Sequence, residues 1–263
     1  MDLQLTGKIA LVTGSTAGIG HGIAASLARE GASVIISGRT ATAVDSAVAA
    51  MKADTRGKVT GFAGDLSEAA VAETLVQRHP IVDILVNNLG IFEVKPFEEI
   101  TDADWQRFFD VNVLSGARLA RLYLPAMRAR NWGRIIFISS ESGYHIPAEM
   151  IHYGMTKAAQ IAVARGLAET TTGTGITVNS VLPGPTRSRG VGDFVAEMAA
   201  KSGRSAETVE RDFFKSARPT SLLQRFATPE EVAAMVTYVA SPLSSATNGA
   251  ALRVDGGTIK SAF

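Results

Sequence analysis

A short apolar run that passes directly into a glycine-rich turn is the feature that most constrains how this chain can fold. Residues 9–13 have the composition of a buried strand, residues 14–20 read Gly-Ser-Thr-Ala-Gly-Ile-Gly, and a helical pattern follows to about residue 30. Glycines at a strand-to-helix turn let the backbone approach a pyrophosphate, and the helix N-terminus offers free N–H groups. The turn lacks the Gly-Lys-Ser or Gly-Lys-Thr ending of a nucleoside triphosphate loop, so it predicts a dinucleotide site.

Short strand-like runs alternate with longer helical patterns along the chain. The candidate strands are residues 9–13, 33–37, 59–63, 84–87, 134–139, 177–182 and 251–254. The candidate helices are residues 20–30, 42–53, 69–78, 103–130, 153–171 and 230–239. This alternation predicts an α/β fold with a doubly wound, parallel, seven-stranded sheet (Rossmann fold) and ligands at the carboxyl ends of the strands. The chain has no repeats or linkers, so residues 1–263 are expected to form one domain.

The segment of residues 187–227 interrupts the alternation and is too long for a simple connecting loop. It carries apolar residues at helical spacing, among them Phe194 and Phe214. Two interpretations stay open: a pair of surface helices that bury one apolar face, or a helical lid that covers the substrate. We adopt the lid, within the same single domain.

The charge balance and composition exclude several kinds of partner. The 26 basic and 25 acidic residues leave a net charge of +1 without a basic cluster, so neither nucleic acid nor a membrane surface is an expected partner. No apolar run approaches the ~20 residues of a membrane span. The absence of cysteine and of a leader-like pattern at the start fits a cytoplasmic location. The four histidines lack metal-ligand spacing, so no metal is expected.

Tyr153 and Lys157, preceded by Ser140, form a candidate proton-transfer group. A spacing of four places both side chains on one helix face, so the lysine charge is expected to lower the tyrosine pKa from its usual value of about 10. The Ser140 hydroxyl can hold the oxygen of a carbonyl or an alcohol. Taken alone, a Tyr-x-x-x-Lys pair is usually an ordinary surface pair, so this interpretation depends on the rest of the chain.

Taken in order, the motifs resemble the short-chain dehydrogenase/reductase family over nearly the whole chain. The landmarks are Thr13-Gly14-x-x-x-Gly18-x-Gly20, Asp65-Leu66, Asn87-Asn88-Leu89-Gly90, Asn112, Ser140, Tyr153, Lys157, Pro183-Gly184 and Val254-Asp255-Gly256-Gly257. The resemblance implies an enzyme that interconverts a ketone and a secondary alcohol by hydride transfer. It implies that Tyr153 is the general acid or base, that Ser140 holds the substrate oxygen, and that Lys157 binds the nicotinamide ribose. Asn112 would bend its helix and hold a water that links Lys157 to solvent.

The residues after the second strand bear on the choice of cofactor. An NAD-preferring site would place Asp or Glu there to bind the ribose 2′-hydroxyl, whereas this chain has Gly38, Arg39 and Thr40. A guanidinium can pair with a 2′-phosphate, which a carboxylate would repel. We therefore expect a preference for NADP(H). NAD(H) stays possible, because an exposed arginine is often merely solvated and residues 15–20 contain no second basic group.

By resemblance, the cofactor contacts extend over several loops. The expected contact residues are Gly14, Ser15, Thr16, Gly18, Ile19, Gly20, Arg39, Asp65, Leu66, Asn88, Leu89, Gly90, Tyr153, Lys157, Pro183, Gly184, Thr186 and Ser188. Asp65 would accept a hydrogen bond from the adenine amino group, and residues 88–90 would line the adenine ribose side. Two positions depart from the family pattern. Leu89 replaces a smaller alanine and either narrows the pocket or enters the core, and Ser188 replaces a threonine but keeps a hydroxyl.

The substrate is less constrained by the sequence. The expected substrate-binding residues are Ser140, His145, Met150, Tyr153, Phe194 and Phe214. With Leu89, the apolar members favour a small or medium-sized hydrophobic ketone or hydroxy compound. A 3-oxoacyl-(carrier protein) reductase is one alternative, although Asn131 and Thr174 stand where such members usually carry arginine. Others are an NAD-dependent alcohol or sugar dehydrogenase and, remotely, a non-catalytic dinucleotide sensor, which would usually have lost the tyrosine or the lysine.

The resemblance also implies an assembly of like subunits. Residues 112–130 and 153–171 form long, alanine-rich helical stretches. Similar proteins pair these helices across a two-fold axis, so a homotetramer, or a homodimer, is expected.

Overall fold

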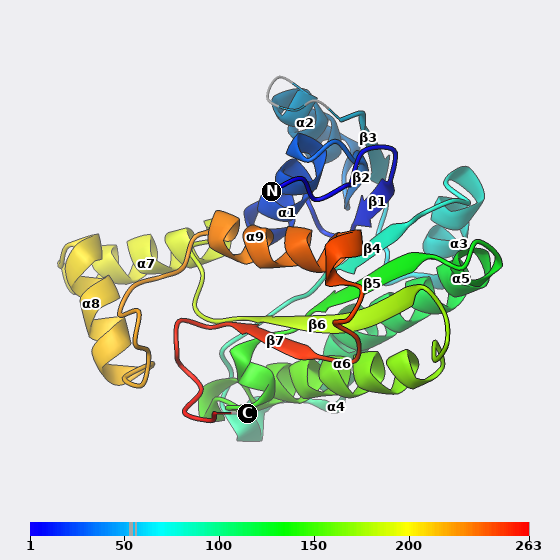
Figure 1. Ribbon diagram of the computed structural model, residues 1–263. Coiled ribbons are helices and arrows are strands. Elements are labelled where there is room, and N and C mark those ends of the chain that lie inside the picture. The colour runs from blue at the N-terminus through cyan, green and yellow to red at the C-terminus, as the bar shows by residue number, and fades with distance from the viewer. Residues whose placement is uncertain (53–54, 56, 263) are drawn as a thin grey trace.

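The computed structural model describes residues 1–52, 55 and 57–262, except for the side chains of residues 189, 190, 193, 194 and 197. Its sheet has seven strands in the order β3-β2-β1-β4-β5-β6-β7, and every neighbouring pair is parallel (Figure 1). The strands are β1 (Ile9–Val12), β2 (Ser33–Gly38), β3 (Val59–Ala63), β4 (Ile84–Asn87), β5 (Gly133–Ile138), β6 (Ile176–Pro183) and β7 (Ala251–Val254). The predicted doubly wound, seven-stranded parallel sheet is therefore confirmed, and each strand lies within one residue of its predicted bounds.

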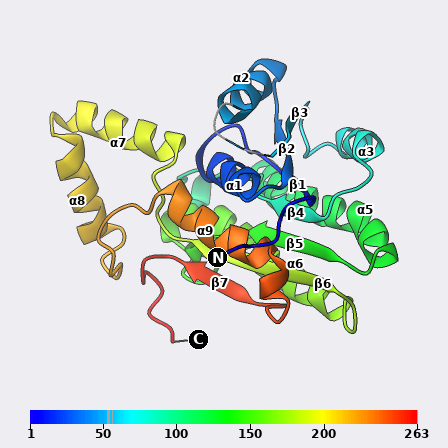
Figure 2. The ribbon, with the colours of Figure 1, turned by 45° about the horizontal axis from the view of Figure 1, so that its top comes forward.

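Helices cover both faces of the sheet (Figures 1 and 2). One face packs against α1 (Gly18–Arg29), α2 (Ala41–Lys52) and α9 (Pro229–Ala240), and the other against α3 (Ala69–Arg78), α5 (Ser115–Ala129) and α6 (Ile151–Glu169). Alternate strand residues serve the two faces: Ala10 and Val12 join the first cluster, and Leu11 joins the second. Both faces are buried, as parallel sheets require.

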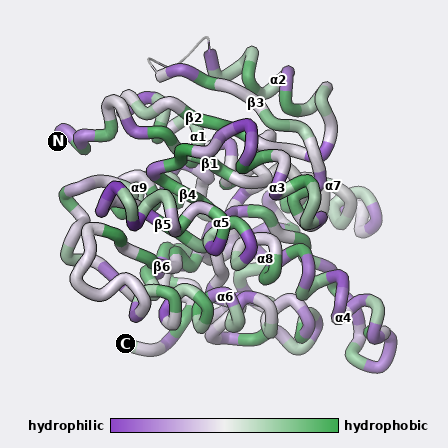
Figure 3. Tube along the Cα trace, turned by 90° about the vertical axis from the view of Figure 1, so that its right-hand side faces the viewer, coloured by the Kyte–Doolittle hydropathy of each residue, from purple (hydrophilic) through white to green (hydrophobic). Residues whose placement is uncertain are grey.

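The distribution of hydropathy follows these layers. Figure 3 shows hydrophobic stretches along the strands and hydrophilic stretches at the outer helices, most clearly at α4 (Asp102–Phe109). In the described part of the chain, no helix is both long and apolar enough to cross a membrane.

The helix predicted over residues 103–130 is interrupted. After α4, residues Asp110–Leu114 form a π-helical turn, and α5 begins at Ser115. Inside the turn, Asn112 directs its side chain to another loop and its backbone carbonyl to a side chain of α6. The bend that the family resemblance implied at Asn112 therefore coincides with this turn, where long-range bonds replace part of the helical ladder.

The segment between β6 and α9 forms two helices, α7 (Arg189–Ser202) and α8 (Ala206–Ser216), which stand away from the sheet beyond the end of β6 (Figures 1 and 2). The two helices pack on each other through a small core of their own that contains Val195, Val209, Phe214 and Phe226. The predicted helical character of residues 187–227 is confirmed. Their action as a substrate lid stays a prediction.

Candidate active site

Glycines shape the turn between β1 and α1. Gly14 and Gly18 have φ angles of +61° and +58°, which favour glycine, and a Cβ at Gly20 would lie 2.6 Å from the Gly14 carbonyl oxygen. The helix N-terminus after this turn has no side-chain cap. The turn therefore combines an open backbone surface with unpaired N–H groups, as an anionic pyrophosphate needs.

A cleft of about 240 Å³ opens beside this turn. Its lining residues are Gly14, Ala17, Gly18, Ile19, Gly20, Asn88, Leu89, Gly90 and Ser188. All of them except Ala17 are among the predicted cofactor residues. Side chains at Gly14, Gly18 or Gly20 would occupy space in or beside this cleft. Because these positions are glycines, the cleft stays open and fits a nicotinamide dinucleotide.

Asn88 and Leu89 support the turn from β4. The Asn88 Nδ2 donates to the carbonyl oxygens of Thr13 and Gly14 at 2.9 and 3.1 Å, and the backbone N–H groups of Asn88 and Leu89 both donate to the Thr13 hydroxyl. The Leu89 side chain lines the cleft and also packs against the sheet core. Leu89 thus does both things that the sequence left open: it narrows the pocket and packs against the core.

Two predicted contact residues have side chains that are buried and make their contacts within the protein. Ser15 is fully buried, and its hydroxyl joins the ends of β1 and β2 by donating to the Val12 carbonyl and accepting from the Ser37 N–H. The Leu66 side chain belongs to the core below the sheet. The Ser15 N–H is also taken, because it donates to the Ser37 carbonyl at 2.9 Å, so both residues support the turn from within.

Arg39 and Asp65 lie on the exposed rim beside the end of β2. Asp65 Oδ1 accepts from the Ser67 hydroxyl and N–H at 2.6 and 3.0 Å. These bonds, with a smaller contribution from the positive charge of Arg39, hold the pKa of Asp65 below its usual value. Arg39 and Asp65 are therefore close enough to interact.

The loop after β6 closes the cleft on its other side. Gly184 donates its N–H to the Val254 carbonyl, and Thr186 donates its hydroxyl to the Gly184 carbonyl. Ser188 caps α7 by accepting from the Val191 N–H, and its Cβ lies 3.2 Å from where a Cβ of Gly18 would be. The loop from Pro183 to Ser188 thus reaches the glycine turn.

The predicted catalytic residues come together at the carboxyl end of the sheet. Ser140 follows β5, and its Oγ accepts from the Ser142 N–H at 3.1 Å, which leaves the hydroxyl proton free to be donated. Tyr153 and Lys157 lie on α6, with the lysine Nζ 5.6 Å from the centre of the tyrosine ring. The Lys157 Nζ also donates to the Ile138 carbonyl at 2.9 Å.

Burial changes the titration of both residues on α6. It raises the pKa of Tyr153 to about 12, partly opposed by a hydrogen bond with Ser140, and it lowers the pKa of Lys157 to about 7. Glu141 raises the pKa of Tyr153 further, and Arg218 lowers it. The expectation that Lys157 would lower the pKa of Tyr153 was wrong, because loss of solvation outweighs the influence of a lysine that is itself disfavoured as a cation. Tyr153 is therefore a protonated acid at neutral pH.

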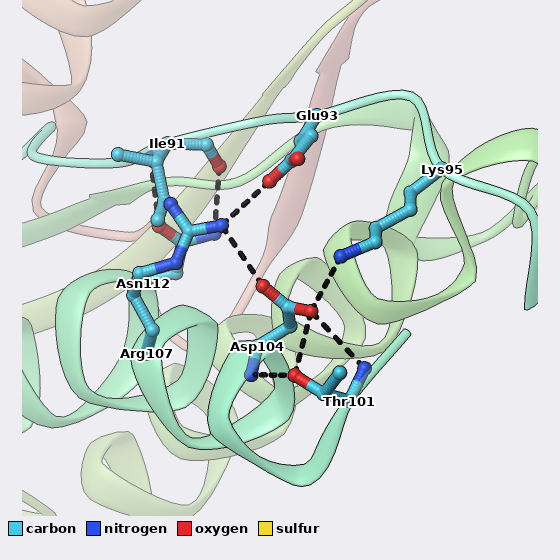
Figure 4. A network of polar contacts seen from close by, with 7 residues as sticks. All are labelled: Ile91, Glu93, Lys95, Thr101, Asp104, Arg107 and Asn112. Carbon is cyan, nitrogen blue, oxygen red and sulfur yellow. Dashed lines mark hydrogen bonds and ion pairs between the residues drawn. The ribbon is translucent and has the colours of Figure 1, made fainter. Parts of the chain in front are cut away.

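Asn112 connects the turn before α5 to the loop after β4, as Figure 4 shows, and also to the catalytic helix. Its side chain forms two bonds with the backbone of Ile91, at 2.8 and 3.0 Å, and donates to the Thr156 hydroxyl at 2.9 Å. Asn112 is 1% exposed, so this side chain is fully committed to holding the loop after β4 against α6.

A network of charges fixes the same loop on α4 (Figure 4). Arg107 bridges Glu93 and Asp104 at 2.5 and 3.3 Å, and Lys95 approaches Asp104 at 2.7 Å. Asp104 also completes a capping box with Thr101 at the start of α4. The network is partly exposed, so it positions the loop more than it stabilises the fold.

The predicted substrate residues have different environments. Met150 is half-buried immediately before α6, and His145 is exposed. Phe214 is buried within the core of α7 and α8, so packing alone accounts for it and we leave it out of the proposed site. The Phe194 side chain lies outside the described residues.

Apolar side chains that the sequence did not single out lie near Tyr153. The ring of Phe92 is half exposed and meets the Tyr153 ring edge-on at 6.4 Å. Tyr144 and Ile146 are also exposed, on the loop that follows Ser140. For Tyr144 and Ile146, the position in the sequence between Ser140 and Tyr153 could have indicated a place near the site.

A buried ion pair beside the catalytic serine was also missed. Arg218, which follows α8, donates to Glu141 at 2.9 Å, and their side chains are only 8% and 4% exposed. Glu149 lies 3.7 Å from the same arginine. The position of Glu141 next to Ser140 was visible in the sequence, but nothing there indicated its partner 77 residues away.

Comparison with known proteins identifies relatives of the chain. The family described as short chain dehydrogenase matches residues 8–215. The uncharacterized oxidoreductase YvrD of Bacillus subtilis is 49% identical over 99% of this chain and 100% of its own length. D-beta-hydroxybutyrate dehydrogenase of Cupriavidus necator is 34% identical over 97% of this chain and 99% of its own. The crystal structure of L-sorbose reductase from Gluconobacter frateurii with NADPH and L-sorbose is 30% identical, with a TM-score of 0.93 over 99% of this chain and 100% of that one.

Proposed function

The chain belongs to the short-chain dehydrogenase/reductase family of NAD(P)-dependent oxidoreductases, and we propose that it uses NADP(H) to interconvert a hydrophobic ketone and the corresponding secondary alcohol. The observation that carries this proposal is the grouping of Ser140, Tyr153 and Lys157 at the end of the sheet, beside the glycine-lined cleft. The NADPH-bound relative supports the cofactor.

The cofactor would lie along the cleft, with its pyrophosphate over residues 14–20 and its nicotinamide between Gly90, Lys157 and the loop from Pro183 to Ser188. When bound, the nicotinamide supplies or accepts the hydride. Arg39 would receive the 2′-phosphate on the exposed rim.

The protein's own residues would handle the proton. In the reducing direction, the hydroxyls of Ser140 and Tyr153 donate hydrogen bonds to the substrate carbonyl oxygen, and Tyr153 transfers its proton to that oxygen. The raised pKa of Tyr153 keeps its hydroxyl protonated at neutral pH, so it can act as the acid. In the oxidising direction Tyr153 must first lose its proton, so that reaction should favour alkaline conditions.

The apolar side chains near Tyr153 favour a hydrophobic substituent on the substrate. Phe92 contacts the Tyr153 ring, Tyr144 and Ile146 are exposed on the loop after Ser140, and Met150 is half-buried immediately before α6. Exposed apolar groups that converge on a site are typical of ligand recognition.

A sugar-like hydroxy ketone is the second candidate, because one observation favours it. Glu141 follows Ser140, and its Oε2 is buried without a hydrogen-bond donor among the described residues. A substrate hydroxyl that reached this oxygen would satisfy it. The L-sorbose reductase relative acts as a precedent for such a substrate.

The test is a panel of aliphatic, aryl and polyhydroxy ketones with NADPH and NADH, followed by Tyr153→Phe. We expect turnover with a hydrophobic ketone and a loss of about 10²- to 10⁴-fold in the variant, the range of a lost general acid. Cofactor binding, followed by fluorescence, should persist. Tyr238→Phe, on the exposed surface of α9, is the matched control. Full turnover in Tyr153→Phe would exclude the proposed acid.

A further inference from the structure

A second cavity lies at the opposite end of the sheet from the cleft. It is lined by residues at or just before the amino ends of β1, β2 and β3, whereas the cleft lies at the carboxyl ends of the strands. Its volume is about 370 Å³, which is within the range of small-molecule sites. α3 ends beside it at Arg78, so the loop of residues 79–81, and not a helix, borders the cavity on this side.

The inner surface of this cavity is largely apolar. Ile35 belongs to the hydrophobic core on the α3 side of the sheet, and Ile9 packs against that core. Ile81, on the loop after α3, is 50% exposed. A chain of several carbon atoms that covered these three side chains would remove apolar surface from water, which favours binding. The cavity can therefore take an apolar group.

Three basic side chains line the same cavity. Lys58 directly precedes β3, and Arg78 and His79 lie at the end of α3. In the part of the chain that the structure describes, none of the three is paired with a carboxylate. The Arg78 guanidinium lies over the Phe62 ring, 5.9 Å from its centre. Burial and the charge of Arg78 both hold the pKa of His79 below its usual value, and no acidic group of the described residues opposes them.

The helix end alone explains only part of this positive charge. Basic residues in the last turn of a helix interact favourably with its dipole, which accounts for Arg78 without any ligand. It does not account for Lys58, which comes from another element. Asp83, the carboxylate that follows the loop after α3, accepts from the Ile9 N–H at 2.9 Å and pairs with Arg130 at 3.2 Å. Asp83 is therefore already bound elsewhere, and the basic groups of the cavity are left to meet an anion from outside.

We propose that this cavity binds a small amphipathic anion, in which an anionic head group is attached to a short apolar chain. Lys58 and Arg78 would hold the head group by charge-assisted hydrogen bonds, and Ile9, Ile35 and Ile81 would cover the chain. The cavity and the catalytic residues lie at opposite ends of the strands, so this site is separate from the proposed hydride transfer and does not depend on it.

The experiment is calorimetric titration of the protein at low ionic strength, where exposed charges are least screened, with octanoate, octanamide and acetate. Octanamide has the chain without the charge, and acetate has the charge without the chain. We expect octanoate to bind about 10-fold more tightly than either of the other two, because each of them loses one of the two kinds of contact. The affinity for octanoate should be the same with and without NADPH.

Two variants place the ligand in this cavity. Lys58→Gln and Arg78→Gln should each raise the dissociation constant for octanoate about 10-fold, the effect of one lost hydrogen bond to a charged group. Both side chains are exposed, so both variants should fold. Lys215→Gln on α8 and Arg121→Gln on α5, at exposed positions away from the cavity, are the matched controls and should bind octanoate like wild type.

Three results would overturn the inference. Absence of octanoate binding at millimolar concentration would remove the site. Wild-type affinity in both Lys58→Gln and Arg78→Gln would place the ligand elsewhere in the protein, and equal affinities for octanoate and octanamide would show that the basic groups contribute nothing.

Discussion

The burial of Lys157 should make the unfolding free energy of the protein depend on pH. Burial lowers its pKa from an ordinary 10.5 to about 7. Between pH 7 and pH 10.5 the unfolded chain holds a proton on this lysine that the native chain lacks. The unfolding free energy therefore rises with pH over this range. Below pH 7 both states are protonated and the rise ends. The raised pKa of Tyr153 has the opposite effect, but only above about pH 10, where the unfolded tyrosine ionises.

We therefore predict a pH-dependent difference between wild type and Lys157→Met. From pH 7 to pH 9, the unfolding free energy of wild type should rise relative to the variant by about 2–3 kcal/mol, at about 1.4 kcal/mol per unit. Urea unfolding of the cofactor-free protein at both pH values measures it. Lys215→Met, at an exposed position on α8, should show no such trend. A constant difference for Lys157→Met would mean that the native lysine keeps its proton.

Arg39 supplies the second prediction at this scale. If its guanidinium meets the 2′-phosphate, Arg39→Ala should raise the dissociation constant for NADPH about 10-fold, as loss of a charge-assisted hydrogen bond of about 1.5 kcal/mol would. Binding of NADH should be nearly unchanged. Arg39→Lys keeps the charge without the bidentate fork and should lie between. Equal losses for both cofactors would contradict the NADP(H) preference.

Gly38→Asp would be the converse change, but the structure argues against it as a single substitution. A Cβ at Gly38 would lie 2.5 Å from the Thr16 methyl group. The glycine is therefore needed for the approach of β2 to the glycine turn, as well as for the absence of a carboxylate. A reversal of cofactor preference should require a smaller residue at position 16 at the same time.

Spacing and the family resemblance together were sufficient to predict Ser140, Tyr153, Lys157 and Asn112 as neighbours. They were insufficient for the direction of the Tyr153 pKa, because a spacing of four along a helix says nothing about loss of solvation. Gln160 shows the same limit: its spacing of three from Lys157 was readable, but its bond to the Asn112 carbonyl, 48 residues away, was not.

Among the elements, the regular ones were the most predictable. β1 to β7 follow from short apolar runs, since a strand buried on both faces needs little else. α4 and α5 were expected as one helix because their apolar spacing continues through the π-helical turn. The apolar spacing did not mark the interruption, whereas the family resemblance implied a bend at Asn112. α7 and α8 were predictable as helices from their spacing. The ion pair between Arg218 and Glu141, which joins the segment after α8 to the loop after β5, was not, because its partners are 77 residues apart.

That ion pair gives the prediction at the scale of elements. Arg218→Met leaves Glu141 as an unpaired buried charge, a change that typically costs about 3–5 kcal/mol. Because α7 and α8 have a core of their own, we expect much of this cost to appear as local opening of the segment after α8. Hydrogen exchange should become faster around residues 206–218 while the strands stay protected.

Adding Glu141→Gln to Arg218→Met removes the unpaired charge and should restore at least half of the lost protection. If the double variant exchanges as fast as Arg218→Met, the segment is held by other contacts. Unchanged exchange in Arg218→Met alone would lead to the same conclusion.

At the scale of the whole molecule, the outer side of α6 carries apolar residues that no other described element of the single subunit covers completely. Met155 and Ala159 are half-buried, and Ala162 and Gly166 are exposed on the same side of the helix. A helix that is apolar on its outer side as well is expected to be covered by another element. This stripe, together with the family resemblance, favours pairing of α6 with its copy in a second subunit.

We predict that the protein is at least a homodimer, and a homotetramer if a second surface also pairs. A Cβ at Gly166 would meet no atom within 4 Å in the single subunit, so Gly166→Arg should leave the fold intact, yet its long charged side chain would separate two closely packed helices. Light scattering at micromolar concentration should therefore give a smaller mass for Gly166→Arg than for wild type. Ala70→Arg, at an exposed position on α3, is the matched control and should keep the wild-type mass. A monomeric wild type would contradict the assembly itself, whereas an unchanged mass in Gly166→Arg would move the interface away from α6.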